Sequence, residues 1–167
     1  PTIGYGIRGA IWYQGESNVG TAYAYEKLLT SMIGAWRSAW NDEFPFYFVQ
    51  IAPYVYGNPN VCALLREAQT QSASYPQTGM VVVSDLVDDI KNIHPNNKRD
   101  VGNRLANYAL ADTYGHTGIA YRSPQYQRTQ IEGEKVRIFF DHSETGLISR
   151  GGAPEAFFIA GSDRKFL

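Results

Sequence analysis

Cysteine, excess charge of either sign and long apolar runs are all scarce in this sequence. Its 167 residues include one cysteine, Cys62, which excludes an internal disulfide and a cysteine-rich metal site. The formal net charge is −1, so the chain lacks the basic excess typical of proteins that bind nucleic acid. No apolar run approaches the roughly 20 residues that a membrane helix requires, and we expect no membrane span.

Short apolar segments alternate with helical periodicity over most of the chain. The apolar segments are rich in Ile, Val and aromatic residues, which predicts buried strands at 7–13, 46–51 and 80–83. Apolar residues at spacings of three and four predict amphipathic helices that begin near Thr21, Val61 and Asn97. Three strand–helix alternations predict an α/β domain with a parallel sheet.

The pattern changes after Gly118, where no helical period appears. Short strands are predicted at 119–121 and 135–140, and glycines interrupt the remainder. We therefore expect residues 1–117 to belong to the α/β domain. Residues 118–167 are expected to form a β-rich segment that is itself incomplete.

Ligand-handling groups of parallel sheets lie in the loops beyond the carboxyl ends of the strands. Two predicted loops of this kind, 14–18 and 84–94, hold the candidate side chains. His94 is the leading general base, because imidazole titrates near neutrality; the alternative is a surface or structurally bonded histidine. His116 and His142 occupy turn-like positions and are interpreted as structural.

Two further readings of these loops are weak. Asp85, Asp88, Asp89 and His94 match neither calcium-loop nor zinc-helix spacing, so we expect a solvated loop and no metal site. Ser17 is followed by Asn18 and then by Val19, where the G-x-S-x-G nucleophile pattern requires glycine. We expect Ser17 to be a loop residue rather than a nucleophile.

Several blocks, in order, carry a specific resemblance to a known family. Trp12 to Asn18 (WYQGESN) closely resembles a block of sialate O-acetylesterases and related acetylxylan esterases. Leu65 to Gln69 resembles the same family's helix, and Asn92 to Lys98, followed by Val101 to Ala106, resembles its histidine block. The tail resembles the β region that continues such proteins. The resemblance implies a three-layer α/β/α, flavodoxin-like fold of the SGNH serine-hydrolase type.

The mechanism that the resemblance implies is two-step acyl transfer without metal or organic cofactor. A serine would attack the acetyl carbonyl, His94 would carry its proton, and the Gln14 amide would donate to the oxyanion. The family's serine lies in a GQSN-like block, which this sequence lacks. We expect that block upstream, in a missing N-terminal part of the same protein, and expect this chain alone to be inactive.

The group that orients His94 is left open. Many relatives carry Asp two or three residues before the histidine, where this chain has Asn92 and Lys91. Either Asp89 reaches the imidazole, or a backbone carbonyl near Lys91 orients the ring in a Ser–His dyad, and we favour the carbonyl.

Substrate contacts are predicted at Arg66, Glu16 and Tyr54. Arg66 could hold the sialic acid carboxylate as a fork, or form an ordinary ion pair on a helix. Glu16 is expected to be structural, either fixing Gln14 or pairing with Arg66. Tyr54 and Tyr56 could stack on sugar, or simply pack the loop.

The leading hypothesis is a serine esterase that removes O-acetyl groups from sialic acid or another acetylated glycan. The alternatives are an acetylxylan esterase and a non-catalytic carbohydrate-binding module. The resemblance also implies an extracytoplasmic location: periplasmic, secreted or lysosomal.

Overall fold

The computed structural model describes residues 2–58, 60–144, 146–149, 152–153, 157–163 and 165. The chain divides into two compact units, Pro1–Ser123 and Pro124–Leu167. The candidate residues all belong to the first unit.

The first unit contains a three-stranded parallel sheet of β1 (Ala10–Trp12), β2 (Phe46–Val49) and β3 (Thr78–Val81), in that order. Trp12 pairs with Phe48, and Phe48 pairs with Met80. The predicted parallel sheet is therefore confirmed. β1 and β2 are shorter than their predicted segments, and β3 has the predicted length but begins two residues earlier. β2 lies in the middle, so its backbone is paired on both sides.

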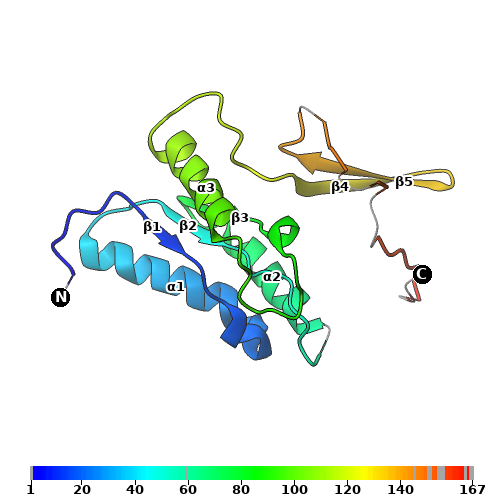
Figure 1. Cartoon of the computed structure of the whole chain (residues 1–167), viewed down its shortest axis with the longest axis horizontal. Coiled ribbons are helices and arrows are strands. Elements are labelled where there is room, and N and C mark those ends of the chain that lie inside the picture. Colours follow the sequence, from blue (N-terminus) through cyan, green and yellow to red (C-terminus); the bar gives the residue numbers. More distant parts are fainter. Residues whose placement is uncertain are drawn as a thin grey trace. The chain divides into compact units, whose positions relative to one another are not determined.

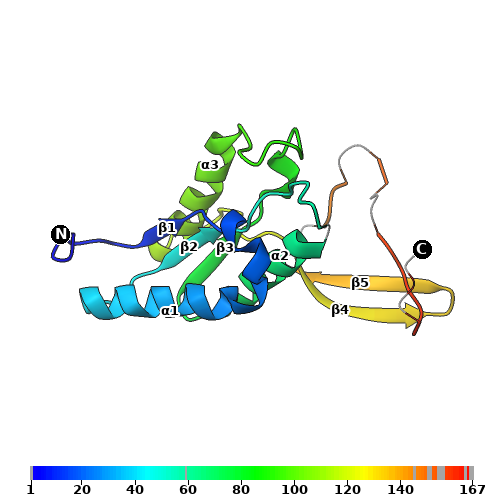
Figure 2. The same cartoon turned by 90° about the horizontal axis from the view of Figure 1, so that it is seen from below.

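Three helices cover the two faces of this sheet. They are α1 (Ala22–Trp40), α2 (Asn60–Ser72) and α3 (Lys98–Tyr108), which continues into a π-helical turn, η3 (Ala109–Thr113). Figure 2 shows α1 and α2 on one face and α3 on the other. The expected α/β fold with three layers is confirmed.

The central strand explains why both faces are covered. All four residues of β2 are buried, and their side chains alternate between the faces. Phe46 and Phe48 join the core under α1 and α2, whereas Tyr47 and Val49 join the core under α3. A continuous apolar strand of this kind requires a layer on each side.

The first residues of α1 and α3 differ in how the helix is capped. α3 begins where it was predicted, and Asn97 caps it, since its Oδ1 accepts a hydrogen bond from the Asp100 N–H at 3.2 Å. Thr21 precedes α1 but makes no side-chain cap. Its hydroxyl lies 3.4 Å from the Asn18 carbonyl instead, because a short 3₁₀-helix, η1 (Glu16–Thr21), runs directly into α1.

The second unit contains an antiparallel hairpin of β4 (Gln125–Glu132) and β5 (Lys135–Asp141). β5 follows the prediction closely, but the strand predicted at 119–121 is wrong. β4 was not predicted, because nearly all of its residues are exposed and the strand therefore lacks the alternation of apolar and polar residues that identifies a half-buried strand. Gly133, with φ of 63°, supplies the left-handed conformation that the tight turn requires.

No helix in the described part of the chain is long and apolar enough to cross a membrane.

A close approach between β3 and α3 makes Gly79 sensitive to substitution. A Cβ atom at Gly79 would lie 2.2 Å from Cε1 of the buried Tyr108. We expect Gly79→Ala to lower the free energy of unfolding by about 1–3 kcal/mol, because the ring or the helix must move. Urea unfolding followed by circular dichroism measures the change.

Gly102→Ala is the matched control, because no atom lies within 4 Å of the added Cβ on this exposed face of α3. It should raise stability by up to about 1 kcal/mol. Equal effects of the two substitutions would contradict the packing argument.

Candidate functional site

Three polar side chains lie where the strands of the sheet end. Gln14 follows β1, Gln50 follows β2, and Ser84 begins the 3₁₀-helix η2 (Ser84–Leu86) after β3. Because the strands are parallel, their carboxyl ends share one edge of the sheet (Figure 1). This is the edge at which open α/β sheets bind ligands.

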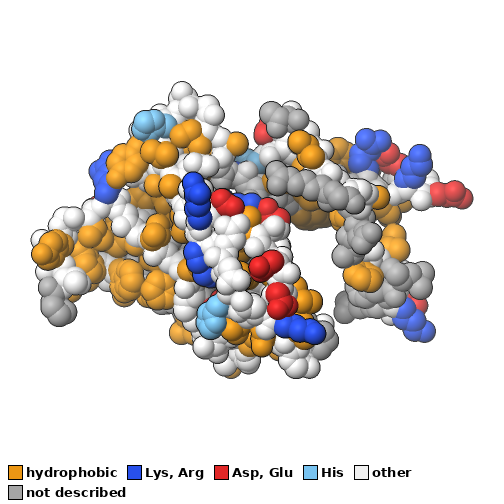
Figure 3. Space-filling model, viewed as in Figure 1, with side chains coloured by type: hydrophobic (Ala, Val, Ile, Leu, Met, Phe, Trp, Pro, Cys, Tyr) orange, Lys and Arg blue, Asp and Glu red, His pale blue; other side chains and the backbone are white. Residues whose placement is uncertain are grey.

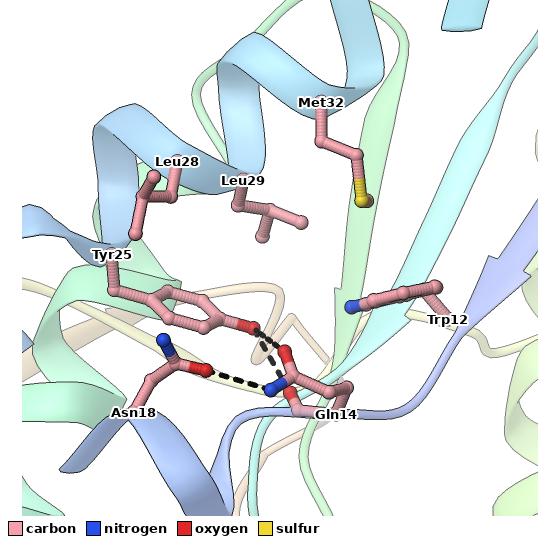
Figure 4. Close-up of a pocket in the computed structure, with 7 residues that line it drawn as sticks. All are labelled: Trp12, Gln14, Asn18, Tyr25, Leu28, Leu29 and Met32. Carbon is pink, nitrogen blue, oxygen red and sulfur yellow. Dashed lines mark hydrogen bonds between the residues drawn. The ribbon is translucent and has the colours of Figure 1, made fainter.

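The Gln14 side chain is held in one orientation (Figure 4). Its Nε2 donates to Asn18 Oδ1 at 2.7 Å. The Tyr25 hydroxyl lies 2.9 Å from the Gln14 carbonyl oxygen and 3.3 Å from its Oε1, and donates to them. Because the Tyr25 hydroxyl donates to Oε1 and Asn18 Oδ1 accepts from Nε2, the positions of the amide oxygen and nitrogen are defined. One N–H of Nε2 then remains without an acceptor among the described residues.

The backbone of the Gln14 loop is fixed from beneath by Gln69. This α2 side chain is fully buried; its Nε2 lies 3.3 Å from the Gln14 carbonyl oxygen, and its Oε1 accepts from the Ile51 N–H at 2.9 Å. A Cβ on Gly15 would lie 2.7 Å from Ile51 Cγ2 and 3.0 Å from Gln69 Nε2. Only glycine fits at that position, so close packing explains why glycine follows Gln14.

Arg66 reaches the same edge from α2. Its Nε donates to Gln50 Oε1 at 3.2 Å, and its Nη2 donates to Ser84 Oγ at 3.0 Å. The Gln50 amide in turn donates to the Arg66 carbonyl at 3.0 Å. No carboxylate forms an ion pair with Arg66 within the described ranges, so neither the helix ion pair nor the pairing with Glu16 is observed there.

His94 is exposed, and its loop is shaped by local hydrogen bonds. The His94 backbone N–H donates to Asn92 Oδ1 at 2.9 Å, which forms a tight turn before the buried Pro95. Asp89 Oδ1 accepts from the Lys91 N–H at 2.8 Å. In the part of the chain that the structure describes, no hydrogen bond joins the imidazole to Asp89 or to a backbone carbonyl.

Two contacts that the sequence did not suggest attach the loops after β1 and β3 to α3. Arg104 forms a two-pronged ion pair with Asp85, with N···O distances of 2.7 and 2.6 Å, and this partner raises the pKa of Arg104. The Lys98 ammonium lies 4.7 Å from the centre of the Tyr13 ring. The strand-end loop of β1 and the start of α3 are therefore linked.

The two tyrosines after β2 pack against each other edge to face, with ring centres 4.8 Å apart. The Tyr56 hydroxyl is buried without a hydrogen-bond partner among the described residues, and burial raises its pKa to about 12. Tyr54 is half-buried. The geometry thus accounts for loop packing, and sugar stacking by Tyr54 stays a prediction.

Glu16 and Ser17 lie on η1 beside Gln14. Within the described residues Glu16 makes no hydrogen bond or ion pair, and Gln14 is held by Asn18 and Tyr25 instead. The Glu16 charge acts at longer range, since it adds to the effect of burial in raising the pKa of Tyr13. Ser17 is exposed. No hydrogen bond joins Ser17 to a histidine, and no group of three metal-ligating side chains occurs, among the described residues.

A family model and several characterised relatives match this chain, and all of them are carbohydrate acetylesterases. A family model described as carbohydrate esterase, sialic acid-specific acetylesterase, matches residues 2–111. Sialate O-acetylesterases from Rattus norvegicus and Homo sapiens are 28% and 27% identical, each over 81% of this chain. The chain spans only 29% and 30% of the length of these two relatives.

A solved structure is also similar. The crystal structure of a carbohydrate acetylesterase from Xanthomonas citri aligns over all of this chain, with a TM-score of 0.90 and 38% sequence identity. The alignment covers 40% of that longer chain.

The hydroxyl groups of Tyr25 and Tyr56 differ in their hydrogen-bond partners, which predicts different effects of removing them. Tyr25→Phe removes the donor to the Gln14 loop and should lower the free energy of unfolding by about 1 kcal/mol. Tyr56→Phe removes a hydroxyl without a described partner and should leave stability equal or higher. Thermal unfolding of both variants at neutral pH measures the difference.

The raised pKa of Tyr56 adds a test at high pH. With a folded pKa of about 12 against an ordinary value of about 10, ionisation of Tyr56 does not affect stability below about pH 10. As pH rises from about 10 through about 12 the unfolded state loses the proton first, so the free energy of unfolding falls. Tyr56→Phe should therefore lose less stability than the unsubstituted protein over this range; an equal loss would contradict the assignment.

Proposed function

Because the chain belongs to the family of sialic acid-specific carbohydrate acetylesterases, we propose that it forms part of a site that removes O-acetyl groups from carbohydrate. The leading substrate is O-acetylated sialic acid. The observation that carries the proposal is the fixed Gln14 amide, whose free N–H lies at the ligand-binding edge of the sheet. Such an amide is suited to bind the oxyanion of ester hydrolysis.

The proposed reaction has two steps. A serine attacks the acetyl carbonyl, His94 accepts the serine proton, and the Gln14 amide donates to the resulting oxyanion. The bond between the acetyl carbon and the sugar oxygen then breaks, and His94 returns the proton to that oxygen. In the second step water, deprotonated by His94, attacks the acetyl-serine, which releases acetate and restores the serine.

We assign the serine to a segment of the same protein outside this chain. The open edge of β1 supports this assignment, because within the described part of the chain β1 pairs with β2 on one side only. Ile11 on β1 is 67% exposed, and it lines a groove of about 210 Å³ with Tyr47 and Tyr114. Figure 3 shows hydrophobic side chains gathered on the β1 side of this unit. An exposed apolar sheet edge of this kind calls for a further strand or helix to cover it.

For His94, we favour orientation of the ring by a backbone carbonyl near Lys91. The Asp89 carboxylate faces the turn, where its Oδ1 accepts from the Lys91 N–H, and among the described residues it makes no hydrogen bond to the imidazole. The imidazole is exposed and free to be positioned when the remaining parts of the domain pack against it.

Arg66 is the residue proposed to distinguish sialic acid from neutral sugars. Its guanidinium is tied to two neutral groups, Gln50 and Ser84, and keeps its charge available at the site edge. A sialic acid carboxylate is a suitable partner, whereas acetylated xylan offers none. We also propose an extracytoplasmic location, which rests on the family resemblance.

The first prediction on activity compares this chain with a version extended upstream. We expect acetate release from O-acetylated sialic acid only by the extended protein. His94→Ala should lower its kcat by roughly 10²–10⁴-fold, and Gln14→Ala by roughly 10²–10³-fold. His116→Ala, an exposed histidine away from this edge, is the control and should change little. Activity of the short chain would show that the nucleophile lies within it.

The second prediction concerns selectivity. Arg66→Gln should lower kcat/KM for O-acetylated sialic acid by roughly 10–100-fold, because a charge-assisted hydrogen bond is lost. Acetylated xylan should be hydrolysed as before. Arg66→Lys, which keeps the charge but not the fork, should fall between. Equal losses on both substrates would mean that Arg66 serves only to fix Gln50 and Ser84.

A further inference from the structure

A second hollow lies beside η1, away from the Gln14 amide. It is a groove of about 260 Å³ between the start of α1 and the length of α2, two elements that Figure 1 shows side by side. Tyr23 and Leu64 supply its apolar part and are 91% and 53% exposed. Glu26, Glu67 and Gln71 supply polar groups to the same groove. An exposed aromatic ring beside hydrogen-bonding groups in a concavity is typical of a ligand site rather than of an ordinary helix surface.

The chemistry of the groove restricts its ligand. Two carboxylates and no Lys, Arg or His line it among the described residues, so an anionic ligand is disfavoured. The carboxylates and the Gln71 amide accept hydrogen bonds from hydroxyl groups. The Tyr23 ring offers an apolar face against which the C–H face of a sugar ring can stack. A neutral sugar matches all of these features.

The position of the groove connects it to the Gln14 site. Val19 and Gly20 line the groove and directly follow Asn18, which binds the Gln14 amide. η1 has six residues and spans only about 10 Å at the 3₁₀ rise of about 2 Å per residue. A short oligosaccharide can therefore occupy both places at once.

We propose that this groove is a subsite for a neutral sugar of the glycan that carries the acetylated residue. The inference rests on the proposed esterase function and deepens it, because it identifies an oligosaccharide rather than a free monosaccharide as the preferred substrate. Stacking on Tyr23 provides the main contact, and the carboxylates orient the sugar hydroxyls.

The test uses the upstream-extended protein and two substrates, O-acetylated sialic acid and O-acetylated sialyllactose. Tyr23→Ala should raise KM for sialyllactose by about three- to tenfold, the loss expected for one aromatic contact. It should leave kcat for sialyllactose, and both constants for the free sugar, unchanged. Tyr5→Ala is the matched control, because Tyr5 is 76% exposed and lies near Trp40 at the opposite end of α1.

A double variant separates a sugar from a basic protein partner. Glu26→Gln with Glu67→Gln keeps the hydrogen-bonding groups but removes both charges. The preference for sialyllactose should persist in this variant. Loss of that preference only in the charge variant, and not in Tyr23→Ala, would overturn the neutral-sugar assignment. A lower Tm of Tyr23→Ala without any change in KM would also overturn it, since the groove would then be an internal contact.

Saturation-transfer NMR with lactose keeps the two proposals distinguishable. If no acetylated substrate is hydrolysed, the proposed function fails. Lactose signals that appear with the unsubstituted protein and vanish in Tyr23→Ala would still support the subsite. Absence of lactose signals with the unsubstituted protein would overturn the subsite, whatever the esterase result.

Discussion

The buried amide of Gln69 is the interaction on which this site depends. It satisfies backbone groups at the ends of two strands, the Ile51 N–H and the carbonyls of Gln14 and Val49. These groups lie where the ladder between β1 and β2 has ended. The Gln14 carbonyl also accepts from Tyr25, but the Ile51 N–H has no other partner among the described residues, so without Gln69 it would be buried and unpaired, at a cost of about 1–3 kcal/mol. Because the amide is fully buried, solvent cannot replace it. The positions at which the chain leaves β1 and β2 are therefore fixed by Gln69, a side chain of α2.

One face of α2 carries this function along its length. Arg66, Gln69 and Thr70 are spaced three and four residues apart and so share one side of the helix. Arg66 and Thr70 hold Gln50 after β2, Arg66 also holds Ser84 after β3, and Gln69 holds the loop after β1. α2 therefore organises all three strand ends. This explains why a helix with few apolar residues facing the sheet belongs to the site as much as the loops do.

The sequence predicted the sheet, the three helices and the edge at which the polar loops lie, because buried strands and amphipathic helices have a visible period. Contacts between distant elements have no such period. The sequence did not predict that Tyr25 and Gln69 bind the Gln14 loop. These contacts form only when α1 and α2 pack together. Asn92 was read merely as the absence of an aspartate, yet its side chain shapes the turn that carries His94. The exposed strand β4 was missed because solvent-facing residues keep no alternation.

Charge is distributed unevenly along the proposed path of the glycan. Arg66 keeps a positive charge without a described carboxylate partner at the site edge, whereas Glu26 and Glu67 make the neighbouring groove negative. At close range these charges act on a bound anion in opposite directions, and because Glu26 and Glu67 are exposed, added salt weakens their effect. An acidic sugar is therefore favoured at Arg66 and disfavoured in the groove, so a glycan with one acidic end enters in one direction. A neutral polysaccharide carries no charge on which these groups could act, so its orientation would depend on van der Waals contacts and hydrogen bonds alone.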